Sequence, residues 1–155
     1  MLLPKDFGGN NSDNLYGNVS SMEDVVSESQ RMEDFCIRLG IKAESAMRMA
    51  LFMEEMAGNI VQHGNADSQK ITGAEYRLFV SDNRICLTLR DYNQAFDPTA
   101  WYHDNSDGNP YEGTGIRIVM GLAEDIYYFN AFNSNNLILW LSTKKVELKN
   151  HKGEL

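Results

Sequence analysis

Apolar residues recur at intervals of three and four along two long stretches in the first half of the chain. The first repeat runs from about Met22 to Leu39, and the second from about Ala43 to His63. This spacing places the apolar side chains on one face of an α-helix. Ser20 and Glu23, which have the spacing of a capping box, precede the first repeat, and a glycine follows each repeat. The pattern therefore predicts two consecutive amphipathic helices.

Shorter stretches alternate between apolar and polar residues, as half-buried strands do. Two pairs of these stretches are separated by short polar turns, so each pair predicts a β-hairpin. The predicted strands are Leu15–Val19, which alternates weakly, Glu75–Val80 and Ile85–Leu89 around Asp82 and Asn83, and Ile126–Phe132 and Leu137–Ser142 around Asn133 to Asn136. A third helix is predicted from about Gly115 to Ala123.

The order of these elements is a strand, two helices, a hairpin, a long loop, a helix and a second hairpin. It predicts an α/β (α+β) two-layer sandwich, in which three helices cover one face of a mixed, mainly antiparallel sheet. Residues 15–143 form the predicted domain, residues 1–14 a flexible lead-in and residues 144–155 a polar tail. Polar chain ends of this kind are commonly loose.

The composition narrows the classes of partner. The chain has 155 residues, enough for one domain with a proper core, and a formal net charge of −8. A negative surplus argues against direct binding to nucleic acid, because cationic side chains are needed to displace counterions from phosphates. No apolar run approaches the roughly 20 residues of a membrane-spanning helix. The two cysteines, Cys36 and Cys86, have no paired spacing, which favours a reducing, cytoplasmic compartment and argues against zinc.

The second predicted helix carries a polar stripe. Glu55, Asn59 and His63 are four residues apart and share one helix face. An amide oxygen suits a hydrated Mg²⁺ ion, which takes few protein ligands, and a carboxylate one turn away can accept a proton from a nucleophile. By itself, however, such a stripe is more often the solvated face of an amphipathic helix.

Two loops add further candidate chemistry. Asp91 ends a predicted strand, where its carboxylate could accept a hydrogen bond from an exocyclic amine such as that of adenine, although the segment to Pro98 could also be an ordinary Asp- and Asn-rich turn. Gly113, Thr114 and Gly115 open the third helix, where glycine lets the backbone approach a phosphate and free N–H groups face it. A single pair of glycines is weak evidence, because many helices follow a glycine-containing loop.

Taken together and in this order, the three stretches resemble the motifs of the GHKL ATPases, which include gyrases, chaperones and histidine kinases. The segment from Glu55 to Gly64 resembles the N box, in the form used by anti-sigma-factor serine/threonine kinases. The segment from Asp91 to Pro98 resembles the G1 box, and that from Gly113 to Val119 the G2 box. The resemblance covers roughly residues 15–143 and implies the Bergerat fold, with ATP and Mg²⁺ as ligands.

The N-box match implies a role for four residues. Glu55 would be the general base, and Asn59 would be the Mg²⁺ ligand. His63 and Gly64 would close the end of the helix beside the nucleotide.

The other two matches would bind the two ends of ATP. Asp91 would hold the adenine amino group, with Asn93 in the same turn. Residues 101–112 would form a lid over the nucleotide. The phosphates would lie along the backbone of Gly113, Thr114 and Gly115.

Two residues depart from the family pattern at the adenine end. Asn93 stands where the G1 box normally has a glycine, and the turn can be kept because Asn tolerates a left-handed backbone better than other non-glycine residues. Leu137 stands where the last strand usually has a threonine, and it cannot form that hydrogen bond. Both departures weaken adenine recognition and leave the phosphate end unchanged.

Three functions remain open at this point. The resemblance implies an ATP-dependent kinase that phosphorylates a serine on an antagonist protein and also holds a sigma factor, and relatives of this type often form homodimers. The alternative is a catalytically inactive nucleotide-binding or adaptor module of the same fold, which could belong to a larger protein. The third is an α/β domain without a ligand.

Overall fold

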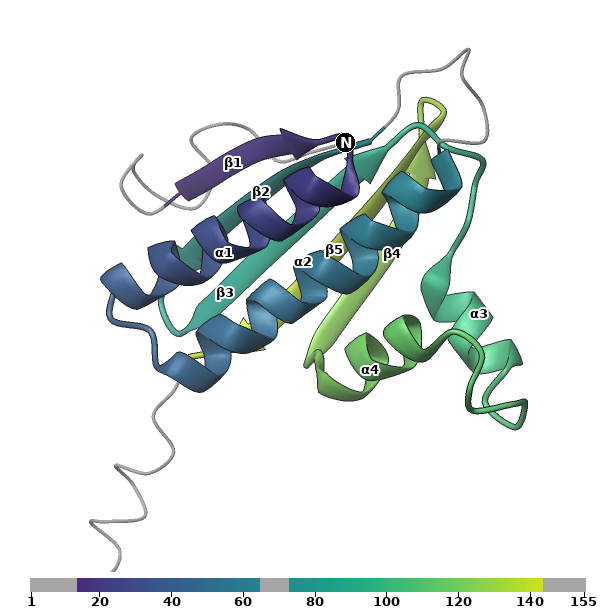
Figure 1. Cartoon of the computed structure of the whole chain (residues 1–155). Helices are drawn as coiled ribbons and strands as arrows, with labels where there is room; N and C mark the ends of the chain where they lie inside the picture. Colours follow the sequence, from purple (N-terminus) through teal and green to yellow (C-terminus); the bar gives the residue numbers. More distant parts are fainter. Residues whose placement is uncertain (1–13, 65–72, 144–155) are drawn as a thin grey trace, which may run out of the picture.

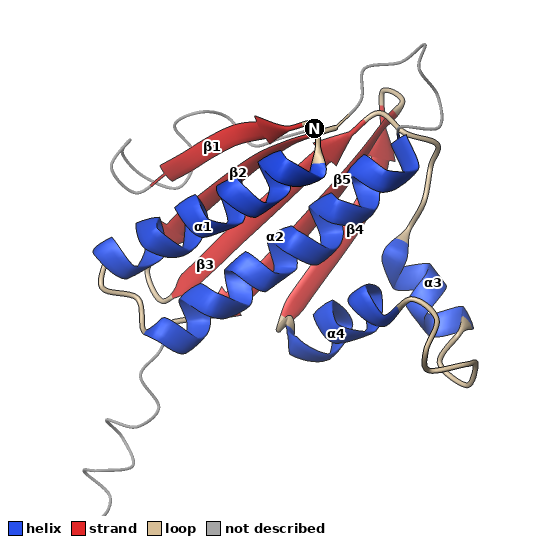
Figure 2. Ribbon diagram, viewed as in Figure 1, coloured by secondary structure: helices blue, strands red, loops and turns tan. Residues whose placement is uncertain are grey.

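The computed structural model describes residues 14–64 and 73–143. In chain order the elements are β1 (Asn14–Val19), α1 (Met22–Arg38), α2 (Ala43–Gly64), β2 (Ala74–Ser81), β3 (Arg84–Asp91), α3 (Pro98–Asp104), α4 (Thr114–Leu122), β4 (Asp125–Ala131) and β5 (Ser134–Ser142). Figure 1 shows α1 and α2 side by side over the sheet, and Figure 2 shows the resulting helical and β layers. The predicted two-layer sandwich is confirmed. The predicted lead-in and tail lie outside the described residues, except Asn14, which already belongs to β1.

The sheet differs from the prediction in one respect. Its strand order is β1-β2-β3-β5-β4, and every neighbouring pair in the described sheet is antiparallel. The expectation of a mixed sheet is therefore wrong. The reason is the position of β5: the chain crosses from β3 through two helices to the edge strand β4, and the hairpin then returns β5 into the gap between them.

The described residues also form four helices, whereas three were predicted. The additional helix, α3, lies in the Asp-, Asn- and Gly-rich stretch that was expected to be a loop. Asp97 caps it by accepting hydrogen bonds from the N–H groups of Thr99 and Ala100, and Pro98 occupies its first turn. α3 packs against α4 and β4. None of the described helices has the length and apolar content that crossing a membrane requires.

The cap of α1 lies one residue later than predicted. Ser21 is the N-cap, and its hydroxyl accepts a hydrogen bond from the N–H of Asp24 at 3.0 Å. The Asp24 carboxylate in turn accepts from the N–H and the hydroxyl of Ser20. Asp24 therefore takes the position that the predicted capping box gave to Glu23, because the helix begins at Met22.

The core lies between the two layers. Residues of α2 such as Phe52 and Met53 are fully buried, and they pack with the inward side chains of the central strands, including Leu87 and Leu139. Full burial of such side chains contributes about 1.5–3 kcal/mol each. Because α2 is held against the central strands in this way, the polar stripe beside its apolar face lies near the end of β3.

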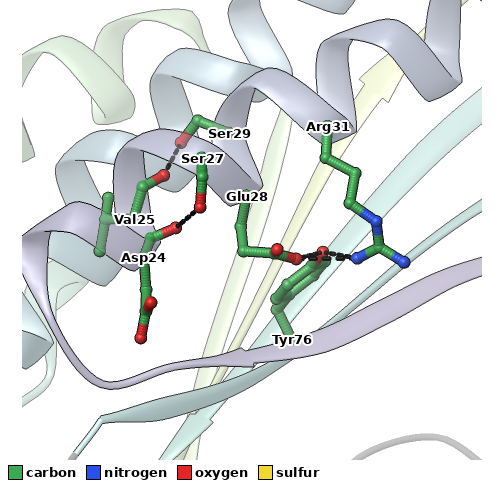
Figure 3. A network of polar contacts seen from close by, with 7 residues as sticks. All are labelled: Asp24, Val25, Ser27, Glu28, Ser29, Arg31 and Tyr76. Atoms are coloured by element: carbon green, nitrogen blue, oxygen red, sulfur yellow. Dashed lines mark hydrogen bonds and ion pairs between the residues drawn. The ribbon is translucent and has the colours of Figure 1, made fainter.

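A polar network fixes α1 to β2 (Figure 3). The Tyr76 hydroxyl donates to Glu28 at 2.5 Å, and Arg31 donates to both Glu28 and the Tyr76 oxygen. Burial is the main cause that raises the pKa of Tyr76, so this hydroxyl keeps its proton. A Cβ added to Gly17 would lie 3.0 Å from the Glu28 carboxylate, so β1 passes directly under the network.

Candidate functional site

A cavity of about 550 Å³ lies between the C-terminal half of α2 and the adjoining ends of the central strands. Its walls come from α2, the loop after β3, the first turns of α3 and α4, and β4 and β5. The size is within the range of small-molecule sites, which are mostly apolar with a few polar groups that fix orientation. The predicted site residues Asn59, His63, Asp91 and Asn93 all line this cavity.

Glu55 lies one turn before Asn59 on α2, does not line the cavity and faces α4. A Cβ added to Gly115 would lie 2.2 Å from the Glu55 Oε1 atom, so only glycine allows the carboxylate to approach the first turn of α4 this closely. The N-box and G2-box matches, which are far apart in the sequence, therefore meet through this pair.

Asp91 is 6% exposed and ends β3. Its Oδ1 atom accepts hydrogen bonds from the N–H of Asn93 and from Nδ2 of Asn135, both at 2.9 Å. Burial raises the pKa of Asp91, and these two hydrogen bonds oppose that shift. Both bonds use Oδ1, and Oδ2 receives no hydrogen bond from the described residues. The carboxylate therefore offers one open acceptor at the cavity.

Asn93 does not use a left-handed backbone: in the part of the chain that the structure describes, the residues other than glycine with positive φ are Asp82, Phe132 and Asn133. Instead, its N–H closes a turn on Asp91, and its side-chain Nδ2 donates to the Ile60 carbonyl at 3.0 Å. The amide is thus turned towards α2.

The contact between Asn93 and α2 also explains why the last residue of α2, Gly64, is a glycine. A Cβ at Gly64 would lie 2.7 Å from the Asn93 Oδ1 atom, so the final helical residue leaves room for this amide. Gly64 acts here as a packing partner of Asn93 at the end of α2, while His63 is exposed at the cavity wall.

Asn135 is a site residue that the sequence did not reveal. It is 6% exposed, lies opposite Asp91 in the sheet and lines the cavity. The polar cluster from Asn133 to Asn136 predicts a turn. In the structure, β5 already begins at Ser134 and the turn consists of Phe132 and Asn133, both with positive φ. Asn is uncommon inside strands, and a buried Asn there is the signal that could have identified it.

The residue at the threonine position of the family, Leu137, makes no polar contact with Asp91. Leu137 pairs with Leu89, is 6% exposed and forms an apolar part of the cavity wall. The polar group beside Asp91 comes from Asn135, two residues earlier on the same strand face.

Gly113 and Thr114 lie at the start of α4 and do not line the cavity, whereas Ile116 of the same helix does. Gly113 is the N-cap, with φ +62, and a Cβ there would lie 2.2 Å from Cη2 of Trp101. Only glycine combines this left-handed backbone with the absence of a Cβ that would clash with Trp101. The first turn of α4, with its free N–H groups, therefore borders the cavity and carries no side chain at Gly113 or Gly115.

The donor set fits Mg²⁺ better than a metal held by protein alone. Among the described residues there is no group of three His, Cys, Asp or Glu side chains that could hold a metal ion. Asn59 lines the cavity, and its amide makes no hydrogen bond with the described residues. One amide oxygen beside a nearby carboxylate suits Mg²⁺, which keeps several waters and completes its shell with phosphate oxygens.

Comparisons with known proteins identify a family and a similar fold. The family model described as a histidine kinase-like ATPase domain matches residues 20–142. A chain in the crystal structure of the SiaB-SiaC complex from Pseudomonas aeruginosa has a similar fold, with a TM-score of 0.64 at 12% identity over 82% of this chain and 88% of that chain. No curated protein sequence matches significantly.

The family match spans most of the chain and includes all three motifs, and the fold agrees with it. The resemblance to the GHKL ATPases is thereby confirmed. The chain belongs to the family of histidine kinase-like ATPase domains.

Proposed function

We propose that this domain binds ATP together with Mg²⁺ and transfers the γ-phosphate to a serine of a partner protein in a partner-switching circuit. The observation that carries the binding step is the open Oδ2 acceptor of Asp91 at the wall of a cavity of about 550 Å³. Binding of ATP follows at the coarse level from membership of an ATPase family. The protein partner is supported by the structural neighbour, which was crystallised as a SiaB-SiaC complex.

The proposed nucleotide position follows the cavity. Adenine would donate its amino group to Asp91, between the apolar walls formed by residues such as Met56 and Leu137. The phosphates would extend towards the first turn of α4, whose backbone N–H groups have no partner within the helix. Bound Mg²⁺ would neutralise phosphate charge, and Asn59 would supply the protein ligand.

Glu55 is the proposed general base. It lies one turn from Asn59 on α2 and touches the helix start where the phosphates would end. A carboxylate in this place can accept the proton of a serine hydroxyl during transfer. We further propose that the antagonist protein and a sigma factor dock near this end, and that the protein acts as a homodimer.

One observation favours a second function, a nucleotide-binding adaptor without transfer. The Glu55 side chain packs against Gly115 and is not part of the cavity wall. If the carboxylate stays outside the cavity when nucleotide is bound, it does not reach a serine hydroxyl at the γ-phosphate. ATP would then bind and change the shape offered to a partner, with no chemistry.

The two functions predict different results for two substitutions. Glu55→Gln removes the base and keeps the side-chain volume, so a kinase should still bind ATP while transfer falls by about 10²–10⁴. Asn59→Ala removes a metal ligand, so both Mg²⁺-dependent binding and transfer should fall. Calorimetry measures binding, and labelled phosphate transfer to a serine-bearing partner measures chemistry.

The chain supplies matched controls on the same helix. Glu54→Gln changes an exposed carboxylate next to Glu55, and Gln62→Ala changes an exposed amide near Asn59. Both controls should leave binding and transfer unchanged. Wild-type protein that binds ATP without transferring it to any partner supports the adaptor, and failure to bind ATP at all contradicts the proposed function.

A further inference from the structure

Asn135 is the most connected polar side chain at the cavity. Its Nδ2 donates to Asp91 Oδ1 at 2.9 Å and to the carbonyls of Asn93 and Gln94, both at 3.2 Å. Its Oδ1 accepts from the Tyr128 hydroxyl at 2.5 Å and from the Phe96 N–H at 3.2 Å. One amide therefore joins the end of β3, the loop that follows it, and β4.

These partners determine which way the amide points. The carboxylate and the two carbonyls are acceptors and require the NH₂ group, while the Phe96 N–H is a donor and requires the oxygen. A reversed amide would place its oxygen against a carboxylate and its NH₂ against an N–H. Since Asn135 is 6% exposed, water cannot readily compensate for such mismatches.

As a consequence, the two carboxylate oxygen atoms of Asp91 differ in their hydrogen bonding. Oδ1 is occupied by Asn135 and by the Asn93 N–H, so Oδ2 remains as the acceptor for a ligand. A 6-aminopurine offers a hydrogen-bond donor to an acceptor in this place. A 6-oxopurine offers a carbonyl oxygen, which a carboxylate repels, and an unsubstituted purine offers neither.

We infer that Asn135 is a positioning residue for the nucleobase: it orients Asp91 and fixes the loop of residues 93–96, so that the site selects a 6-aminopurine. The inference rests on the proposed binding of ATP. It assigns the selectivity to a strand residue that does not itself contact the reacting phosphate. The same amide also holds the turn in which Asn93 replaces the glycine of the family, because Asn135 donates to the Asn93 carbonyl.

The test compares three nucleotides in binding calorimetry: ATP, ITP with a 6-oxo group, and purine riboside triphosphate with no 6-substituent. Wild-type protein should prefer ATP over both. Asn135→Ala should weaken ATP binding by roughly tenfold and change binding of the unsubstituted nucleotide much less, because a lost hydrogen bond to a charged group acts mainly on the amino contact. The ratio of the affinity for ATP to the affinity for the unsubstituted nucleotide should therefore decrease strongly.

A pH profile provides a readout that a purely structural role would not alter. The Asn135 hydrogen bond lowers the pKa of Asp91 against the larger effect of burial. Without this hydrogen bond, the pKa of Asp91 is higher. As the solution is acidified, Asn135→Ala should therefore lose ATP binding at a higher pH than the wild type does. Asn133→Gly, in the exposed turn of the same hairpin, is the matched control and should behave as wild type.

Tyr128→Phe provides a second variant if Asn135→Ala does not fold. It removes the hydroxyl that donates to Asn135 and keeps the ring, so the ATP preference should fall in the same direction by a smaller factor. Equal weakening of all three nucleotides, or an unchanged preference in the variants, overturns the role of Asn135 while leaving ATP binding intact. Wild-type protein that binds none of the three contradicts the proposed function itself.

Discussion

The Asp91 carboxylate is buried in a position that disfavours its ionised form. It is 6% exposed, and burial raises its pKa even though Asn93 and Asn135 both donate to it. A carboxyl whose pKa is higher in the folded state favours folding at low pH, and this contribution is lost as the pH rises through the folded-state pKa. At neutral pH, the ionised Asp91 therefore lowers the free energy of unfolding.

Asp91→Asn should consequently change stability and binding in opposite directions. Asn keeps an oxygen that can accept from Asn93 and Asn135, but it replaces the free Oδ2 with an NH₂ donor. We expect the variant to unfold at higher urea than the wild type at about pH 7.5, with a smaller difference at a lower pH, where Asp91 takes up its proton. ATP binding should weaken roughly tenfold or more.

Urea unfolding at the two pH values and calorimetry with ATP measure these two effects. Asp104→Asn, at the exposed end of α3, controls for the change in net charge. Equal ATP affinity in Asp91→Asn and the wild type would show that Asp91 does not hold the base.

At the level of elements, the connection between α3 and α4 depends on one side chain. Arg117 donates to the carbonyls of Glu112 at 2.8 Å, Asn105 at 2.9 Å and Asn109 at 3.2 Å. Its guanidinium also lies 5.2 Å from the centre of the Trp101 ring, which covers Gly113. The loop predicted to be a lid is thus organised from α4, the helix whose start would bind phosphate.

Arg117→Lys should loosen this loop without unfolding the domain. Lysine keeps the charge but cannot satisfy three carbonyls from a planar group. The amides of Gly108 and Glu112 bond to the Asn105 and Asn109 carbonyls that Arg117 also holds, so their hydrogen exchange should accelerate several-fold. Exchange in the β2–β3 hairpin should not change, and Arg38→Lys at the end of α1 is the control. Unaltered exchange at both amides would show that Arg117 does not organise the loop.

The type and order of most elements followed from the sequence because their apolar periodicity is long and regular. α1, α2 and α4 have the predicted positions to within one or two residues. α3 was missed because seven residues in a polar stretch show no apolar repeat, although Asp97 before Pro98 is a helix-start signal. The start of β5 was missed because three of its first residues are polar, which resembles a turn.

At the scale of the whole molecule, the limits of prediction lie in contacts between distant segments. The polar stripe of α2 and the loop at Asp91 were found as local motifs. The bond between Asp91 and Asn135 depends on the register of β3 against β5, which periodicity alone does not give. The contact of Glu55 with Gly115 likewise depends on how α4 packs beside α2.

The cavity is built from both layers, so its ligand should stabilise the whole fold. α2 and α4 supply one side, and β4, β5 and the loop after β3 supply the other. A ligand that binds only the folded state raises the free energy of unfolding by about 2.7 kcal/mol at a concentration of 100 times its Kd. For a domain of this size, that corresponds to a rise in Tm of roughly 5–10 °C.

We therefore expect ATP with Mg²⁺ to raise the Tm of the wild-type protein by this amount in thermal unfolding, and ATP with a chelator to raise it less. Mg²⁺ alone should have little effect, because Asn59 as a single protein ligand cannot hold the ion without phosphate oxygens. Asp91→Asn should start from a higher Tm and gain only about half as much from ATP at the same concentration, because tenfold weaker binding leaves about 1.4 kcal/mol of the stabilisation. This combination of higher basal stability and reduced ligand response separates a base-binding role of Asp91 from a general structural one. A wild-type Tm that does not respond to ATP at millimolar concentration would contradict nucleotide binding in this cavity.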